Sequence, residues 1–537
     1  MKIFNLLVIF FSIPNFFFAQ SEDAWIYFNN KPEAQTYLSQ PLLMLNQKSL
    51  DRRTHHNIAI DLTDVPIHQP YVQTIDAIEN IEVLAQSKWF NCVYVRGQLA
   101  AIQQTTSLGF VQNIIYANKS LNGSGDQSTT FNHHIYKWID LTTRTYGQAQ
   151  NQIEIHQGQL LHDAGFKGNN KIIAVLDSGF QGVDTTDNFQ HLFSENRIIG
   201  GYNLVNRNNN PYSNHHHGTM VLSTMAVNLP NQFIGTAPQA SYLLYVTEDV
   251  TSETPLEEAL WVEAAELADA AGADIINTSL GYNTYDNAAY NHTYADMNGQ
   301  TTFITKGSNM AFNKGIFCVT AAGNAGNSPW IYITAPADAI NTLTVGAINA
   351  NLEQVGFSSN GPTADNRIKP DLMALGQQSA VLNVGGIIST ASGTSFSSPI
   401  TAGLVASLWQ ALPQLKNHEL LQLIKENSSF FLSPNNQYGY GIPCFYCAYQ
   451  NALNITTSET STFEIYPNPF ENLLNINLKN EIAAPYNFQL KNTLGQTVFE
   501  TKIYAHQNRM SFNLASGLYF YEIVGLKEKF TGKIIRK

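Results

Sequence analysis

Short apolar runs recur through the middle of the chain and alternate with helical segments. A helix is predicted between two of these runs, with Pro255 near its first turn and Gly272 as its stop. Continuous apolar strands separated by helices are typical of a parallel sheet covered on both faces. We therefore predict a three-layer α/β domain with a mostly parallel sheet, whose strands include 172–176, 241–246, 275–277, 317–320 and 342–345.

The pattern changes on either side of this region. Residues 23–117 mix strand-like and helix-like pieces, which predicts an α+β unit, and the Ser/Gly/Asn-rich stretch 118–130 reads as an exposed linker. A second polar linker, 455–462, precedes a region with period-two alternation and Gly and Asn turns. That pattern predicts a small antiparallel all-β sandwich. Its strands include 473–478, 496–499 and 518–523.

The first residues have the pattern of a secretory signal peptide. Met1 and Lys2 give a positive start, and an apolar run over 3–11 follows, with a plausible cut after Ala19. A buried helix is the alternative, but the N-terminal position and the short length favour export. No later stretch is long and apolar enough to cross a bilayer.

Composition narrows the classes of function. The 537 residues carry a net charge of −12, which disfavours a nucleic-acid partner. Four cysteines are too few for a disulfide framework. Cys318 lies in an apolar run and is expected to be a small buried hydrophobe, whereas Cys92 stands alone. Cys444 and Cys447 form a single CxxC, which leaves a local disulfide and two free thiols equally open.

Three segments supply the parts of a hydrolytic triad. Asp177 ends an apolar run, where a parallel sheet places ligand-binding groups. His217 and Ser395 each stand at the expected start of a helix. Taken singly, each residue has another explanation. Asp177 could be a helix cap and Ser395 an N-cap, and His217 could belong to a solvated or metal-binding histidine patch at 215–217. Together they follow the chain order Asp, His, Ser, which is one of the known orders for such a triad.

The local sequences around these residues carry a resemblance to a family. The chain resembles subtilisin-like serine peptidases over roughly residues 146–452. The matching segments are 174–179, 217–219, 276–281, 319–324 and 393–399. The resemblance implies that Ser395 is the nucleophile, His217 its base and Asp177 the orienting carboxylate. It also implies that Asn324 donates its amide to the oxyanion.

The resemblance further implies two backbone walls around a substrate side chain. One wall is Ser279, Leu280 and Gly281, and the other is Ala321, Ala322 and Gly323; their small residues suggest an open slot for apolar or bulky side chains. A Tyr/Asn/Asp-rich insert, 282–313, could shape the cleft or hold calcium, but we favour a variable surface loop. No cofactor is needed for the chemistry. No metal ligands are assigned, a structural calcium is left open, and a metal role for His215 and His216 is disfavoured.

The flanking regions fit an exported zymogen. The N-terminal unit resembles the family's inhibitory propeptide in position and character. The C-terminal unit contains the segments 465–470 and 517–519 and ends in a basic segment, 532–537. With these segments it looks like the sorting domain that is recognised by the type IX secretion machinery. A carbohydrate-binding or adhesion sandwich is the alternative for that unit. The expected location is secreted or attached to the cell surface, through the periplasm of a Gram-negative bacterium.

The resulting prediction is a secreted serine endopeptidase that acts on protein or peptide substrates and is inhibited by its own propeptide. We expect it to be a monomer. The rival from another class is a catalytically idle adhesion or binding protein on the same scaffold. The expected organisation is a signal peptide, a propeptide with linker, a peptidase domain, a second linker and a sorting domain, at 1–19, 20–145, 146–453, 454–462 and 463–537.

Overall fold

The computed structural model describes most of the chain in two compact units, Met1–Ala448 and Tyr449–Lys537. The described residues are 21–122, 145–455, 463–467, 469–478, 485–493, 495–503, 507–525 and 529–537. The predicted signal peptide and most of the two predicted linkers lie outside these residues. The helices of the described residues include none that is long and apolar enough to cross a membrane.

The first unit begins with a four-stranded antiparallel sheet in the order β2-β3-β1-β4. Its inner face packs on the helices of the same segment through a core that includes Ile26, Val93 and Ile102. The predicted α+β character is confirmed. The elements are β1 (Ser21–Phe28), α1 (Ala34–Ser39), α2 (Gln47–His56), α3 (Gln69–Asp76), β2 (Ile81–Ser87), β3 (Cys92–Gln98), α4 (Leu99–Gln104) and β4 (Val111–Tyr116).

A seven-stranded sheet forms the centre of the first unit, in the order β13-β12-β11-β10-β5-β9-β6. Every neighbouring pair is parallel, as the continuous apolar runs predict. The five predicted strands are confirmed, and β6 and β13 are additional. The strands are β5 (Ile172–Asp177), β6 (Ile198–Asn203), β9 (Ser241–Val246), β10 (Ile275–Thr278), β11 (Phe317–Ala321), β12 (Leu343–Ile348) and β13 (Leu372–Leu375).

Helices and short hairpins surround this sheet. The helix predicted after Pro255 is confirmed as α9, and it ends just before Gly272. The helices are α5 (Gln150–Glu154), α6 (Gly158–Asp163), α7 (Gln190–Ser194), α8 (His217–Ala226), α9 (Leu256–Ala270), α10 (Phe303–Asn313), α11 (Thr394–Ala411), α12 (Asn417–Glu426) and α13 (Phe445–Ile455), the last running into the second unit. The hairpins pair β7 (Asn228–Leu229) with β8 (Phe233–Ile234) and β14 (Ser379–Leu382) with β15 (Ile388–Ala391).

Two neighbouring residues of β10 show that helices cover both faces of the sheet. Successive side chains of a strand point to opposite faces. Asn277 Oδ1 accepts a hydrogen bond from Ser398 of α11 (2.8 Å), whereas Thr278 Oγ1 accepts one from Trp261 of α9 (3.1 Å). Helices α11 and α9 therefore lie on opposite faces, which gives the predicted three layers.

Residues 282–313 are not a surface loop throughout, so the favoured interpretation of this insert is wrong. Its last part forms α10, and Phe303, Ile304, Ala311 and Phe312 are buried. Gly307 brings α10 close to α9, where a Cβ would meet a Val262 methyl group at 2.5 Å. The apolar spacing within the insert is helical, and packing against α9 buries it.

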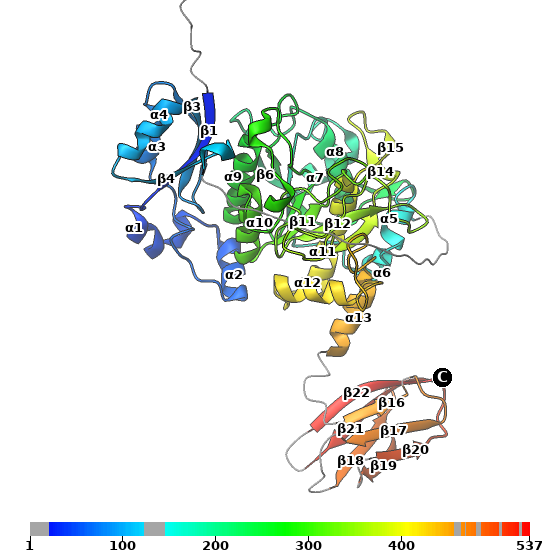
Figure 1. Ribbon diagram of the computed structural model, residues 1–537. Coiled ribbons are helices and arrows are strands. Elements are labelled where there is room, and N and C mark those ends of the chain that lie inside the picture. Colours follow the sequence, from blue (N-terminus) through cyan, green and yellow to red (C-terminus); the bar gives the residue numbers. More distant parts are fainter. Residues whose placement is uncertain are drawn as a thin grey trace, which may run out of the picture. The chain divides into compact units, whose positions relative to one another are not determined.

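The N-terminal segment is joined to the central domain by buried charges. Helix α2 contributes two arginines: Arg53 pairs with Asp64 and Asp269 (both 2.8 Å), and Arg52 also pairs with Asp269. One turn earlier on α9, Glu266 accepts hydrogen bonds from Ser87 Oγ and from the backbone of Lys88 and Trp89. In Figure 1 the blue N-terminal elements accordingly lie beside the green α9 and α10.

The second unit is a sandwich of two antiparallel sheets, β16-β17-β20 and β19-β18-β21-β22, as predicted. The core between them is apolar and includes Leu474, Ile476, Phe488 and Leu490, which are pairs at alternate strand positions. The strands are β16 (Phe463–Tyr466), β17 (Leu473–Leu478), β18 (Tyr486–Lys491), β19 (Thr497–Ile503), β20 (Gln507–Ser511), β21 (Gly517–Val524) and β22 (Lys529–Arg536).

The cysteines occupy three different environments. Cys444 and Cys447 form a disulfide, which decides between the two alternatives that the sequence leaves open. Cys318 is a buried free thiol, as predicted, and Cys92 is also buried and free. Burial raises the pKa of the Cys318 thiol to about 12, so it stays protonated at neutral pH.

The buried charges of α2 generate a test of stability. We expect Asp269→Ala, made in a Ser395→Ala chain to prevent self-digestion, to lower the free energy of unfolding by about 3–5 kcal/mol, because two guanidinium groups lose their shared partner. All six tryptophans precede the second unit, so their fluorescence during urea titration reports the first unit. Asp51→Ala, on the exposed side of α2, is the control and should change stability by less than about 0.5 kcal/mol. Equal destabilisation by both would contradict the role of the buried pairs.

Candidate active site

Asp177, His217 and Ser395 come from three elements that meet at the carboxyl edge of the central sheet. Asp177 is the last residue of β5, His217 the first residue of α8, and Ser395 the second residue of α11. In an open parallel sheet this edge is where ligands bind. The fold thus brings together residues that are more than 200 positions apart in the sequence.

Asp177 and His217 form a hydrogen-bonded pair. The Nδ1 atom of His217 donates to Oδ1 of Asp177 at 2.8 Å, and the backbone N–H of Ser178 donates to the same oxygen, also at 2.8 Å. The side chain of Asp177 is 1% exposed, whereas that of His217 is 24% exposed. The imidazole is therefore oriented from its buried side, and its other nitrogen is free to act at the surface of the cleft.

The surrounding charges decide the pKa of His217. Burial disfavours the imidazolium, but the charge of Asp177 and its hydrogen bond outweigh burial, and the charge of Glu248 adds to them. Together they raise the pKa of His217 above its usual 6.5. The site therefore stabilises the cation that a histidine becomes when it takes a proton.

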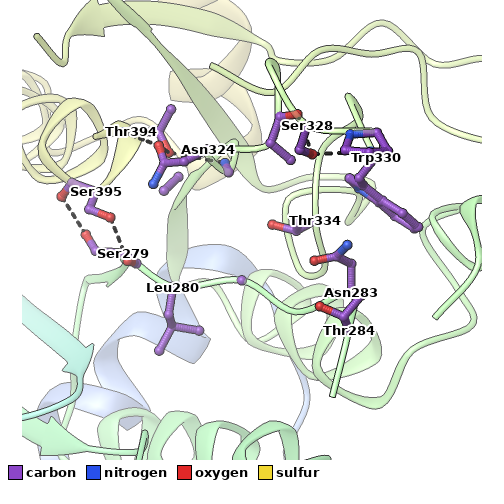
Figure 2. Close-up of a pocket in the computed structure, with 15 residues that line it drawn as sticks. Ser279, Leu280, Asn283, Thr284, Asn324, Ser328, Trp330, Thr334, Thr394 and Ser395 are labelled. Atoms are coloured by element: carbon purple, nitrogen blue, oxygen red, sulfur yellow. Dashed lines mark hydrogen bonds between the residues drawn. The ribbon is translucent and has the colours of Figure 1, made fainter. Parts of the chain in front are cut away.

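Ser395 is held at the start of α11 by a reciprocal contact with the end of β10. Its Oγ donates to the carbonyl of Ser279 (3.1 Å), and Oγ of Ser279 donates to the carbonyl of Ser395 (2.9 Å), as Figure 2 shows. Among the described residues no hydrogen bond joins Ser395 to His217, although the ring of Phe396 lies 5.9 Å from the imidazole. Catalytic hydrogen bonds are commonly loose without substrate, and a rotation about χ1 redirects the serine hydroxyl.

Asn324 is fixed beside Ser395 by its carbonyl oxygen. Oδ1 accepts hydrogen bonds from the backbone N–H of Thr394 (2.9 Å) and from Oγ1 of Thr394 (3.0 Å). Its Nδ2 is thereby directed elsewhere. A Cβ placed on Gly393 would lie 3.6 Å from Nδ2 of Asn324 and 3.7 Å from the backbone nitrogen of Ser395. Two N–H donors therefore border one small space, which is the arrangement that stabilises an oxyanion.

A cavity of about 730 Å³ opens beside Ser395 and Asn324. Of the six residues predicted to wall a substrate pocket, five line it: Ser279, Leu280, Gly281, Ala321 and Gly323. Ala322 does not, because it packs behind the wall against Ile333 and Ala337. The remaining lining residues are Asn283, Thr284, Asn324, Ala325, Ser328, Pro329, Trp330, Thr334, Thr394 and Ser395, most of them visible in Figure 2.

Thr334 was missed by the sequence analysis and supplies a polar point in the pocket wall. It is buried, and its Oγ1 has no hydrogen-bond partner among the described residues. A Cβ on Gly281 or Gly323 would lie 2.3 Å or 2.9 Å from this oxygen, so the two glycines admit it between the walls. No signal in the sequence near Thr334 distinguishes it; only the folded position does.

The histidines before His217 and the acidic groups of the described residues give no metal centre. Oγ of Ser178 and Nδ1 of His215 are 3.3 Å apart, and the rings of His215 and His216 lie 4.3 Å apart. Within the described ranges, no group of three or more His, Cys, Asp or Glu side chains is arranged to hold a metal ion.

The fold and this site define the class: an α/β protein with Asp, His and Ser gathered at one edge of a parallel sheet. The model of the subtilase family matches residues 168–441, and the chain belongs to that family. Two further models match its flanks: a peptidase S8 propeptide domain of Bacteroidota at 23–133, and a secretion system C-terminal sorting domain at 464–537.

Relatives within the family are similar over the central region. Subtilisin E from Bacillus subtilis (strain 168) is 30% identical over 285 residues, which cover 52% of this chain and 66% of that protein. Serine protease AprX from the same organism is 29% identical over 304 residues, covering 51% of this chain and 65% of AprX. The chain thus spans just under two thirds of these relatives. A solved structure of MycP1 with the N-terminal propeptide removed has 22% identity and a TM-score of 0.44, and the match covers 56% of this chain and 96% of that one.

The charges around His217 give a direct test. In NMR titrations of ring-labelled histidine, assigned by comparison with His217→Gln, we expect the His217 pKa above 6.5. Asp177→Asn should lower this pKa most, because the charge of Asp177 is the main effect that opposes burial. Glu248→Gln should lower the pKa less. Glu426→Gln, on the exposed side of α12, is the control and should leave it unchanged. An unshifted resonance in Asp177→Asn would contradict the pairing.

Proposed function

We propose that this subtilase is a secreted serine endopeptidase with Ser395 as nucleophile. The observation that carries the proposal is the hydrogen bond between His217 and Asp177 at the same edge of the sheet as Ser395, which lines an open cavity together with Asn324. Each group supplies a role that the others lack. The similarity to Subtilisin E and Serine protease AprX supports the same activity.

The proposed mechanism begins when a substrate displaces the Ser395 hydroxyl from the Ser279 carbonyl. His217 takes the proton as Oγ attacks the scissile carbonyl, and Asp177 stabilises the imidazolium. Nδ2 of Asn324 and the backbone N–H of Ser395 donate to the oxyanion. His217 then protonates the leaving amine, and water hydrolyses the acyl-enzyme by the same route. Because His217 must be neutral to act, its raised pKa places the acidic limb of the pH profile above pH 6.5.

The substrate is proposed to be an extended peptide bound between the two walls. The side chain before the scissile bond would enter the cavity beside Gly281 and Gly323. The small walls admit an apolar or bulky group, and the buried Thr334 hydroxyl lies beside the two glycines. The reaction requires no cofactor, and the enzyme is proposed to act as a monomer.

The flanking regions are proposed to serve maturation and export. Residues 20–145 would act as an inhibitory propeptide with its linker, after a signal peptide at 1–19. The peptidase domain would span 146–453, and a linker at 454–462 would lead to the sorting domain at 463–537. A sorting domain indicates export to the cell surface or the medium. The finer proposal is delivery by the type IX machinery from the periplasm of a Gram-negative bacterium.

Replacement of the nucleophile is the central test. Ser395→Ala should lower kcat by about 10⁶-fold, because no other group can form the acyl-enzyme. A fluorophosphonate probe should label the matured wild type and not the variant. The variant, made in a protease-deficient host, should also keep its N-terminal segment if maturation is autocatalytic.

Ser398→Ala is the matched control. Ser398 lies one turn further along α11 and donates to Asn277 within the core, so its loss should affect stability more than labelling. A correctly folded wild type that neither takes the probe nor cleaves any peptide would support the rival proposal of an idle adhesion protein on this scaffold.

Truncation tests the role of the second unit. A chain that ends after residue 460 should keep peptidase activity but accumulate inside the cell rather than at its surface or in the medium. Activity and localisation are measured in the same cultures by peptide cleavage and cell fractionation. Equal surface delivery of the truncated and full-length proteins would refute the sorting role and favour a carbohydrate-binding or adhesion sandwich.

A further inference from the structure

An unpaired glutamate lies next to the catalytic pair. Glu248 follows β9, the neighbour of β5 in the sheet, and the backbone N–H of the preceding Thr247 donates to the carbonyl of Asp177 (3.0 Å). The Glu248 side chain is only partly exposed. Among the described residues it makes no hydrogen bond and no ion pair. Burial and the charge of Asp177 raise the pKa of Glu248 to about 7, and His217 opposes that shift, which places the carboxylate within electrostatic reach of both residues.

Three more groups lie within electrostatic reach of Glu248. Glu257 is 2% exposed, and while its Oε1 accepts from the backbone of Asp249 (2.9 Å), its Oε2 has no partner among the described residues. Tyr282 is 1% exposed and its hydroxyl is likewise unpartnered. Burial, and after it the charges of Glu257, Glu248 and Glu253, raise the pKa of that hydroxyl, so it lies within electrostatic reach of the three carboxylates. We call these four residues, Glu248, Glu253, Glu257 and Tyr282, the acidic subsite.

The described residues provide no basic side chain that neutralises the acidic subsite. Within the described residues no Lys or Arg pairs with any of its three glutamates, whereas the other buried carboxylates Asp269 and Asp371 have such partners. Burial and the charge of Asp286 raise the pKa of Glu253 to about 7, and burial with the charges of Glu253 and Glu248 raises that of Glu257 to about 9. Buried carboxylates within electrostatic reach of one another are costly, and a bound positive charge would relieve both the desolvation and the repulsion.

The position of the subsite follows from the path of an extended substrate. Tyr282 comes directly after Gly281, the end of the wall that would pair with the peptide. Successive side chains of an extended chain point to opposite sides. If the side chain before the scissile bond enters the cavity beside Asn324, the next one back points away from it. That direction is the side of His217, where Glu248 lies.

We propose that the acidic subsite binds a lysine or arginine side chain at the second substrate residue before the scissile bond, and so makes this peptidase selective for basic sequences. The inference rests on the proposed peptidase function. A peptide cation is favoured over a metal ion, because no three His, Cys, Asp or Glu side chains of the described residues come together as metal ligands. A lysine or arginine instead brings one charge on a long stem that can reach Glu248 from the cleft.

The experiment compares two peptides that differ only by Lys or Gln at this second residue, with cleavage positions read by mass spectrometry. For the matured wild-type enzyme we expect kcat/KM to be about tenfold higher for the Lys peptide, since removing one partner of a partly buried charge pair has an effect of this order. Glu248→Gln should bring the ratio close to one, and Glu248→Asp should keep a preference. Any effect of Glu248 on His217 changes kcat/KM for both peptides alike, so it cancels in the ratio of the two values.

Charge reversal and a matched control sharpen the test. Glu248→Lys should prefer a peptide with Glu at the second residue, which a merely structural role would not produce. Glu426→Gln, an exposed glutamate on α12, should keep the wild-type ratio.

Each outcome has a distinct meaning. Cleavage of both peptides by the wild type at equal rates would overturn the inference and leave the peptidase function intact. No cleavage of any peptide would overturn both. A preference present only with added Ca²⁺ and lost in EDTA would assign the subsite to a metal and overturn the peptide-cation proposal.

Discussion

The buried carboxylate of Asp177 is the constraint on which the rest of the site depends. It sits at the end of a strand that is buried along its whole length, and only one of its oxygens is hydrogen-bonded among the described residues. A charge in such a place must be compensated by what surrounds it. The imidazole of His217 supplies that compensation when it is protonated, which is why its pKa is raised and it becomes a better base. Burial and the same Asp177 charge also raise the pKa of Glu248, which disfavours its carboxylate and leaves it in need of a positive partner.

The parallel sheet makes this coupling unavoidable. Strands β5, β9 and β10 are neighbours, so the residues that follow them emerge side by side at one edge. Asp177 follows from the first, Glu248 from the second, and the Ser279–Gly281 wall from the third. The proposed orienting carboxylate, acidic subsite and substrate wall are therefore positioned by the same backbone ladder, and Asp177 and Glu248 influence each other through charge rather than contact.

Much of this could be predicted from the sequence, because the strongest signals are local. Continuous apolar runs gave five of the seven strands, and the motif residues Asp177, His217 and Ser395 each stand at the end of an element. Strand β6 was missed because Gly200 and Gly201 interrupt its apolar pattern, and α10 because a polar stretch precedes it. Thr334 and Glu257 could not be predicted at all, since nothing in their neighbourhoods shows that each becomes buried with an unpartnered side-chain oxygen.

The paired arginines of α2 bear on how long the two halves of the first unit stay together. All the contacts of Arg52 and Arg53 with Asp269 lie outside the stretch between residues 122 and 145, so a cut in that stretch breaks none of them. A severed N-terminal segment would remain as a stoichiometric subunit, held by charges that must be rehydrated before it leaves. The onset of activity after cleavage would then be governed by the half-life of that complex, and its proteolytic clearance would count for more than the cut itself.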